Sequence, residues 1–226
     1  MITDPITTSV TSGSVHLAGP SVEWTALLPL LFLLVGGLVM LTISSFLKPR
    51  IGRHVYPWMT VALAVAAAIS AVPVWARVQG WNSIMWIDVT HSQVGPFSTI
   101  AGAVGVDGFG MFITIVLCLG VALAALLAPS YLRSEQMEGP SFYVLVLLSA
   151  SGGVMMAMAN DLIVLFIGLE TLSLAVYVLT GMHLRRAESQ ESGLKYFLLG
   201  GFASAFLLYG IAMLYGATGS TNFIAI

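Results

Sequence analysis

The most constraining feature of this chain is a long apolar run with one carboxylate at its centre. It covers residues 161 to 182, DLIVLFIGLETLSLAVYVLTGM. About 20 apolar residues in a helix cross the hydrocarbon core of a bilayer. Glu170 lies nine residues from one end of the run and twelve from the other. The sequence therefore predicts a membrane-spanning helix with Glu170 near the midplane.

An acidic side chain at that depth is expensive. A charged residue at the centre of an inserting helix costs roughly 2.5 to 3.5 kcal/mol, so such residues are rare and usually have a function or a partner. We interpret Glu170 as a group that takes up and releases a proton. The alternative is a structural hydrogen bond from its carboxyl to a neighbouring helix.

Polar residues share the face of Glu170 on one side only. At about 100° per residue, three of them lie within about 80° of Glu170; they are Ser173, Tyr177 and Thr180. Toward residue 161 the same face carries Ile163, Phe166 and Ile167. This one-sided stripe is typical of a half-channel that leads protons from one membrane surface to a buried carboxyl. Alternatively, the hydroxyl groups bond to backbone carbonyls or adjacent helices, which is common in membranes.

Composition extends the membrane assignment to the whole chain. Of its 226 residues, 58% are hydrophobic and 8% charged, and the mean hydropathy is +0.97, whereas soluble domains carry about 25% charged residues. The formal charge of −2 argues against nucleic acid as a partner. The single cysteine, Cys118, lies in an apolar run and excludes an intramolecular disulfide or a cysteine-based metal site.

Apolar periodicity predicts an all-α polytopic membrane protein with six transmembrane helices. Residues 1 to 22 form a polar, external N-terminus without Lys or Arg, so we expect the first apolar run to be an uncleaved span rather than a signal peptide. Asp107 and Asp161 are the expected N-caps of the third and fifth helices. Within a transmembrane region of residues 23 to 226, the helices cover about 24–47, 57–78, 107–128, 141–159, 161–182 and 193–216.

The one long connection, residues 79 to 106, has Gly and Pro around short mixed runs, which predicts a small surface hairpin. Trp81 and Trp86 suit the membrane interface. We interpret His91 as a solvated loop histidine, and no metal site is predicted.

The sixth helix carries a patch of small residues that would let another helix approach closely. These are Gly200, Gly201, Ala203, Ser204 and Ala205. Lys195 lies near the start of this helix and could extend its ammonium to the surface. From the residues alone it is equally well an interfacial anchor or a functional group.

Basic residues predict the orientation. Seven of the eight fall in or beside the connections after helices one, three and five, and only Arg77 falls toward the other side; the seven are Lys48, Arg50, Arg53, Arg133, Arg185, Arg186 and Lys195. The positive-inside rule then places the N-terminus outside and these connections in the cytoplasm. The polar stripe beside Glu170 would open toward the cytoplasm.

Three stretches together resemble a known family. They are VDGFGMF at the third helix, NDLIVLFIGLETLSLAVYVLTG at the fifth and SGLKYFLLGGFASAFLLYGIAMLYGATGS at the sixth. The chain resembles the subunit N family of the proton-pumping NADH:quinone oxidoreductase, bacterial respiratory complex I, well over residues 105 to 222 and in pattern before that. Subunits L and M and the Mrp-type antiporters share the buried Glu but differ around LKYFLLG.

The resemblance implies an antiporter-like subunit of about fourteen helices, of which this chain would be an N-terminal fragment lacking the lysines of helices seven, eight and twelve. Glu170 matches the glutamate of the family's helix five, and Lys195 matches a lysine near the start of the family's helix six. The resemblance implies that both residues take part in proton transfer. Ala175 stands where the family often has proline.

It further implies a multi-pass protein of the bacterial plasma (inner) membrane whose partners are the bilayer and the other membrane-arm subunits of complex I. Proton translocation would be coupled to quinone reduction elsewhere in this translocase. NADH and quinone would be used by the whole complex, with no cofactor bound and no redox catalysis in this chain. The alternatives are a monovalent cation/proton antiporter subunit and a non-transporting structural spacer.

Overall fold

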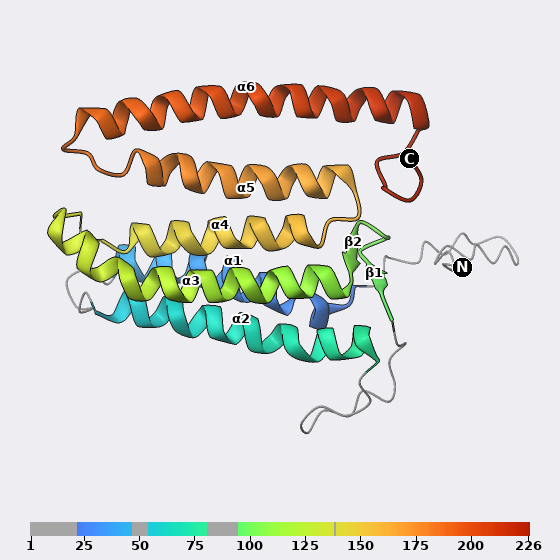
Figure 1. The fold of residues 1–226 in the computed structure, drawn as a ribbon, viewed down its shortest axis with the longest axis horizontal. Coiled ribbons are helices and arrows are strands. Elements are labelled where there is room, and N and C mark those ends of the chain that lie inside the picture. The colour runs from blue at the N-terminus through green and yellow to red at the C-terminus, as the bar shows by residue number, and fades with distance from the viewer. Residues whose placement is uncertain (1–21, 47–53, 81–94, 138) are drawn as a thin grey trace, which may run out of the picture.

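The structure is a computed structural model that describes residues 22–46, 54–80, 95–137 and 139–226. These residues contain six α-helices that lie roughly parallel to one another, and successive helices run in opposite directions (Figure 1). Their bounds are α1 Trp24–Phe46, α2 Val55–Gln79, α3 Gly108–Ser134, α4 Ser141–Ala157, α5 Leu162–Thr180 and α6 Ala187–Thr218.

Five of these helices are long and apolar enough to cross a membrane, and α4 is a shorter apolar helix of 17 residues. Large apolar side chains remain exposed on the outside of the bundle, among them Leu199 at 70%, Phe202 at 66% and Leu127 at 74%. A water-soluble surface does not carry so much contiguous apolar area. The predicted fold class, an all-α polytopic membrane protein, is confirmed.

The core lies among the first four helices. Leu33, Met40, Met111, Leu147 and Val154 are fully buried there. Helix α5 packs on the outside of α4, and α6 packs on α5 (Figure 1). Helix α6 buries only Gly193 and Ile211, so most of its circumference faces away from the rest of the chain.

Two helices differ in extent from the expected ranges. Helix α3 continues past residue 128 to Ser134, and its last turn places Leu132 in the core. Helix α6 begins at Ala187 rather than near residue 193. The Ser189 hydroxyl donates to the Thr180 carbonyl at 2.7 Å, so the first turn of α6 is tied to the end of α5.

The expected N-caps are confirmed. The Asp107 carboxylate accepts from the Gly110 backbone N–H at 2.6 Å and begins α3. The Asp161 carboxylate accepts from the Ile163 N–H at 2.8 Å and begins α5. A carboxylate at this position satisfies free amides and suits the positive end of the helix dipole.

The hairpin predicted in the long connection is also confirmed. Strands β1, Phe97–Thr99, and β2, Val104–Val106, pair antiparallel, with Ser98 opposite Gly105. Trp81, Trp86 and His91 lie outside the described residues, as do residues 1 to 21 and the basic residues 48, 50 and 53.

The hairpin turn holds together the ends of three elements. The Gly102 carbonyl accepts from the side-chain amides of Asn160, at 2.8 Å, and Asn222, at 3.1 Å. Asn160 lies in the tight turn between α4 and α5, and Asn222 follows α6. This joint fixes the start of α5 relative to the end of α6.

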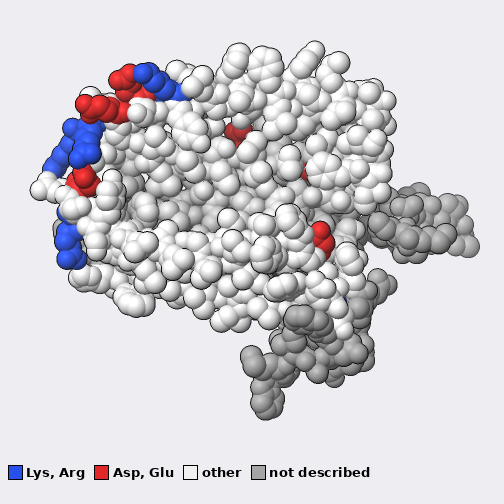
Figure 2. Space-filling model, in the orientation of Figure 1, with Lys and Arg blue, Asp and Glu red and all other residues white. Residues whose placement is uncertain are grey.

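Charge gathers at the opposite end of the bundle. The Lys and Arg side chains visible in Figure 2 lie at that end. Arg133 is in the last turn of α3, Arg185 and Arg186 lie between α5 and α6, and Lys195 follows in α6. Arg77, near the end of α2, is at the other end and pairs with Glu23 at 3.5 Å.

Candidate functional site

Helix α5 is seated on α4 by a contact between backbones next to Glu170. Gly152 of α4 faces Gly168 of α5, and a Cβ built on Gly152 would lie 2.6 Å from the Gly168 carbonyl oxygen. A Cβ on Gly168 would lie 2.9 Å from the backbone nitrogen of Met156. Since only glycine fits at either position, the distance between the two helices is set within one turn of Glu170.

Glu170 is the ninth of the 19 residues of α5, near its middle. Its Oε1 atom is buried, with no hydrogen-bond partner among the described residues. Gly168, two residues earlier, faces α4, so Glu170 points away from α4 by about 160° around the helix. Tyr177, seven residues later on nearly the same face, packs on α6. The carboxyl therefore lies on the α6 side of α5.

Close contacts define how α5 and α6 pair. Gly181 faces Gly193, where an added Cβ would lie 2.8 Å from the Gly181 Cα. Tyr177 faces Gly200 and packs edge-on against Tyr196, with ring centroids 4.8 Å apart. Continuing this antiparallel register places Ser204 to Leu207 opposite Glu170.

The small-residue patch of α6 is therefore divided. Gly200 and Ser204 are half-buried toward α5, whereas Gly201, Ala203 and Ala205 are exposed. The neighbour that approaches the patch within the described residues is α5, through Tyr177.

The polar stripe keeps the order that the helical period predicts. Ser173 is half-buried and Tyr177 buried, while the Thr180 hydroxyl donates to the Val176 carbonyl in its own helix at 2.9 Å. Thr180 therefore makes the hydrogen bond to a backbone carbonyl that the alternative interpretation of the polar stripe predicts. Helix α5 runs through Ala175 without interruption.

The structure does not bring Lys195 and Glu170 together. Lys195 is exposed and forms an ion pair with Glu191, one turn earlier in α6. It lies nine to twelve residues from the segment opposite Glu170, which corresponds to about 14 to 18 Å along the helix axis. Its ammonium is thus at the basic end of the bundle.

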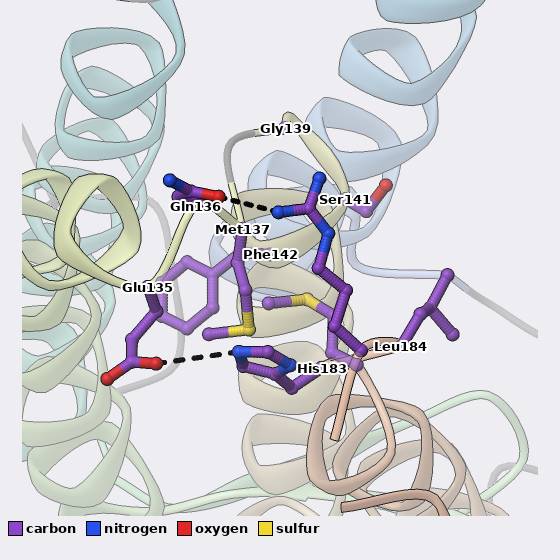
Figure 3. Close-up of a pocket in the computed structure, with 10 residues that line it drawn as sticks. Glu135, Gln136, Met137, Gly139, Ser141, Phe142, His183 and Leu184 are labelled. Atoms are coloured by element: carbon purple, nitrogen blue, oxygen red, sulfur yellow. Dashed lines mark hydrogen bonds and ion pairs between the residues drawn. The ribbon is translucent and has the colours of Figure 1, made fainter. Parts of the chain in front are cut away.

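Periodicity missed a polar cluster at that same end. The Glu135 carboxylate, at the C-cap of α3, lies 3.4 Å from Nε2 of His183 (Figure 3). The same carboxylate lies 2.7 Å from Nη2 of Arg186. The Arg185 guanidinium donates to the Gln136 side chain at 2.5 Å. These residues come from two connections far apart in sequence, so no local pattern pairs them.

Cys118 is free and buried in the core, as expected for a packing thiol. In the part of the chain that the structure describes, no group of three or more His, Cys, Asp or Glu side chains could hold a metal ion. Met158 is buried in the core and Met156 covers Gly168, so both are packing residues here.

Known proteins resemble this chain in sequence and in fold. Residues 159 to 226 match the family described as NADH:quinone oxidoreductase/Mrp antiporter, TM. The chain is 38% identical over 206 residues to NADH-quinone oxidoreductase subunit N 1 of Sorangium cellulosum, which covers 90% of this chain and 39% of that one. It is also 40% identical over 200 residues to NADH-quinone oxidoreductase subunit N of Gemmatimonas aurantiaca, and this match covers 87% of this chain and 36% of that one.

Solved structures share the fold. A chain of respiratory complex I from Thermus thermophilus with bound aureothin superposes with a TM-score of 0.66 at 29% identity, covering 86% of this chain and 38% of that one. A chain of an archaeal membrane-bound sulfane sulfur reductase superposes with a TM-score of 0.68 at 23% identity, covering 88% of this chain and 39% of that one. At this identity the likeness shows the fold alone.

The chain spans about two fifths of the length of the curated relatives it matches. The matched stretch covers about nine tenths of this chain. On these similarities the chain resembles the subunit N proteins of NADH:quinone oxidoreductase.

Proposed function

We propose that this chain is part of a membrane-arm subunit of NADH:quinone oxidoreductase and takes part in proton translocation coupled to quinone reduction. The observation that carries the proposal is the Glu170 carboxyl, whose Oε1 is buried at mid-helix without a hydrogen-bond partner in the described residues. A carboxyl used only to hold two helices together would be expected to bond to one of them.

Glu170 is the proposed proton carrier, and Ser173, Tyr177 and Thr180 are its supporting polar path. Their spacing of three or four residues corresponds to axial steps of about 4.5 to 6 Å, which a single water can bridge between hydroxyl groups. Lys195 is proposed as a second proton-transfer group, acting at the basic end rather than beside Glu170.

The proposed partners are the lipid bilayer and the other membrane-arm subunits, and the proposed location is the bacterial inner membrane. The basic end of the bundle would face the cytoplasm and the N-terminus the outside. NADH and quinone would be handled by other subunits, so that this chain moves protons without carrying out redox chemistry.

The carboxyl must change its charge to move protons. Burial disfavours an unpaired charge strongly, so a cation that approaches or leaves Glu170 would switch it between proton-bearing and proton-free forms. Within the described residues the mid-span face of α5 and α6 offers no Lys or Arg. We propose that another part of the assembled subunit supplies this cation.

The test is proton pumping per NADH oxidised, in inverted vesicles that contain the complete complex. Glu170→Gln and Glu170→Ala should lower the ratio sharply, and Glu170→Asp should retain part of it. Glu188→Gln is the matched control, because Glu188 is exposed in the first turn of α6. Full pumping in the Ala variant would remove Glu170 from the mechanism and favour a structural spacer.

A monovalent cation/proton antiporter is the second candidate, because the matching family description names both classes. Sodium dependence separates them. Transport that requires sodium and stops in Glu170→Gln would identify an antiporter, whereas sodium-independent pumping driven by NADH supports the primary proposal.

A further inference from the structure

The polar cluster between α3 and the α5–α6 connection surrounds a histidine that the proposed proton path does not yet use. The His183 side chain is 14% exposed, with Nε2 facing the Glu135 carboxylate at 3.4 Å. Its Nδ1 is buried and has no hydrogen-bond partner among the described residues. One ring nitrogen thus lies near a carboxylate and the other has no protein partner.

Two cavities meet at this side chain. One, of about 320 Å³, is bounded by Glu135, Gln136, Phe142 and Arg185 (Figure 3). The other, of about 260 Å³, is bounded by Tyr131, Leu179, Thr180 and Ser189. His183 lines both, so it stands between the charged end of the bundle and the first hydroxyl of the polar stripe.

The cavity that reaches Thr180 joins the cluster to the path toward Glu170. From Thr180 the stripe continues through Tyr177 and Ser173 at steps of about one helical turn. Both cavities are large enough for several waters, since one water occupies about 30 Å³ of liquid volume. Water in the second cavity can therefore lie between the His183 side chain and Thr180, both of which line it.

Imidazole suits the entrance of such a path. It is the side chain that gains and loses a proton near neutral pH, and it can take a proton at one nitrogen while releasing another from the second. The charged groups that face it are Glu135, held by Arg186 at 2.7 Å, and Arg185, which is hydrogen-bonded to Gln136.

We infer that His183 is the proton-collecting residue at the mouth of the path to Glu170, with Glu135 and Arg186 as its positioning partners. This inference rests on the proposed proton translocation. In each passage a proton from bulk water binds one nitrogen of neutral His183. The proton on the other nitrogen leaves to cavity water beside Thr180, which leaves the ring neutral in its other tautomer, and rotation of the ring restores the first tautomer before the next passage.

The test measures pumping per NADH oxidised in vesicles containing the complete complex, from about pH 6 to about pH 8.5, values on either side of the ordinary imidazole pKa of about 6.5. His183→Gln keeps a polar group that can donate to Glu135 but cannot titrate. We expect a severalfold loss of pumping at the alkaline end and near-normal pumping at the acidic end. His54→Gln, at an exposed histidine of the same end, should leave the profile unchanged.

Chemical rescue separates proton collection from a merely structural contact. His183→Ala enlarges the two cavities, and imidazole added to the medium should restore much of its alkaline pumping. Imidazole should have no effect on Glu170→Gln, whose defect lies beyond the entrance.

Three results would overturn the inference. A flat pH profile in His183→Gln would show that this side chain collects no protons. An equal loss at every pH without imidazole rescue would mean that His183 only holds the two connections together. Normal pumping in both His183→Gln and Glu170→Gln would instead reject the proposed function, and the inference with it.

Discussion

Tyr177 and Gly200 interlock so closely that a single methyl group would not fit between them. A Cβ built on Gly200 would lie 1.8 Å from the Tyr177 hydroxyl oxygen and 2.4 Å from its Cζ. Tyr177 is two helical turns from Glu170, between that carboxyl and Thr180. This contact pairs α5 with α6.

Replacing Gly200 by alanine should therefore separate α6 from α5. Overpacking a tight contact typically costs about 1 to 3 kcal/mol, and we expect a clear fall in the melting temperature of the detergent-purified protein. Gly201→Ala is the matched control, because an added Cβ there meets nothing within 4 Å. Equal melting temperatures for the two variants would show that the interlock does not hold in solution.

Gly168→Ala should impair pumping without altering a titratable group. The added Cβ would lie 2.9 Å from the Met156 backbone nitrogen, so α5 must shift relative to α4 two residues before Glu170. We expect reduced pumping per NADH together with a loss of stability of about 1 to 3 kcal/mol. Gly120→Ala, where a Cβ has open space, should leave both unchanged; an unchanged ratio in Gly168→Ala would show that the site tolerates the shift.

Asp161→Ala should destabilise the joint between α5 and the end of α6. Asp161 accepts from the Ile163 N–H at 2.8 Å and from the Thr221 hydroxyl at 2.6 Å. Loss of an N-cap costs about 0.5 to 2 kcal/mol, which thermal unfolding can measure. Asp161→Asn keeps an oxygen for the cap and should retain most of the stability. If Asn is as damaging as Ala, the charge rather than the cap is what matters.

Lys195→Ala should affect pumping less than Glu170→Ala. Lys195 is exposed and its ion partner Glu191 is also exposed, so water can replace the ammonium without leaving a buried charge. Comparing the two variants by pumping per NADH in the same vesicles tests this order. A larger defect in Lys195→Ala would make it the principal proton-transfer group.

Cysteine labelling tests the orientation, which rests on the basic residues. In a Cys118→Ala background, a cysteine at Ala225 should react with an impermeant maleimide added to intact cells. One at Glu188, at the opposite end of the bundle, should react only after the cells are opened. Both residues are exposed. The reverse pattern would invert the topology and with it the direction of the proposed proton path.

Local chemistry explains which elements were predictable. Apolar length and periodicity predicted the helices, Asp107 and Asp161 predicted where α3 and α5 begin, and turn residues predicted the hairpin. Each of these depends on neighbours in the chain. The start of α6 was placed too late because Ala187 to Ser192 is polar, and the contact between Ser189 and Thr180 that supports its first turn is tertiary.

The sequence by itself determined that this chain spans a membrane, and it determined that Glu170 lies at mid-helix with hydroxyl groups on one side. Hydrocarbon thickness and the helical period translate directly into residue spacing. Only the tertiary structure decided that Glu170 points toward α6 and that His183 meets Glu135. Those facts depend on the register between helices. Close contacts at Gly168 and Gly200 set that register, and no repeat in the sequence encodes it.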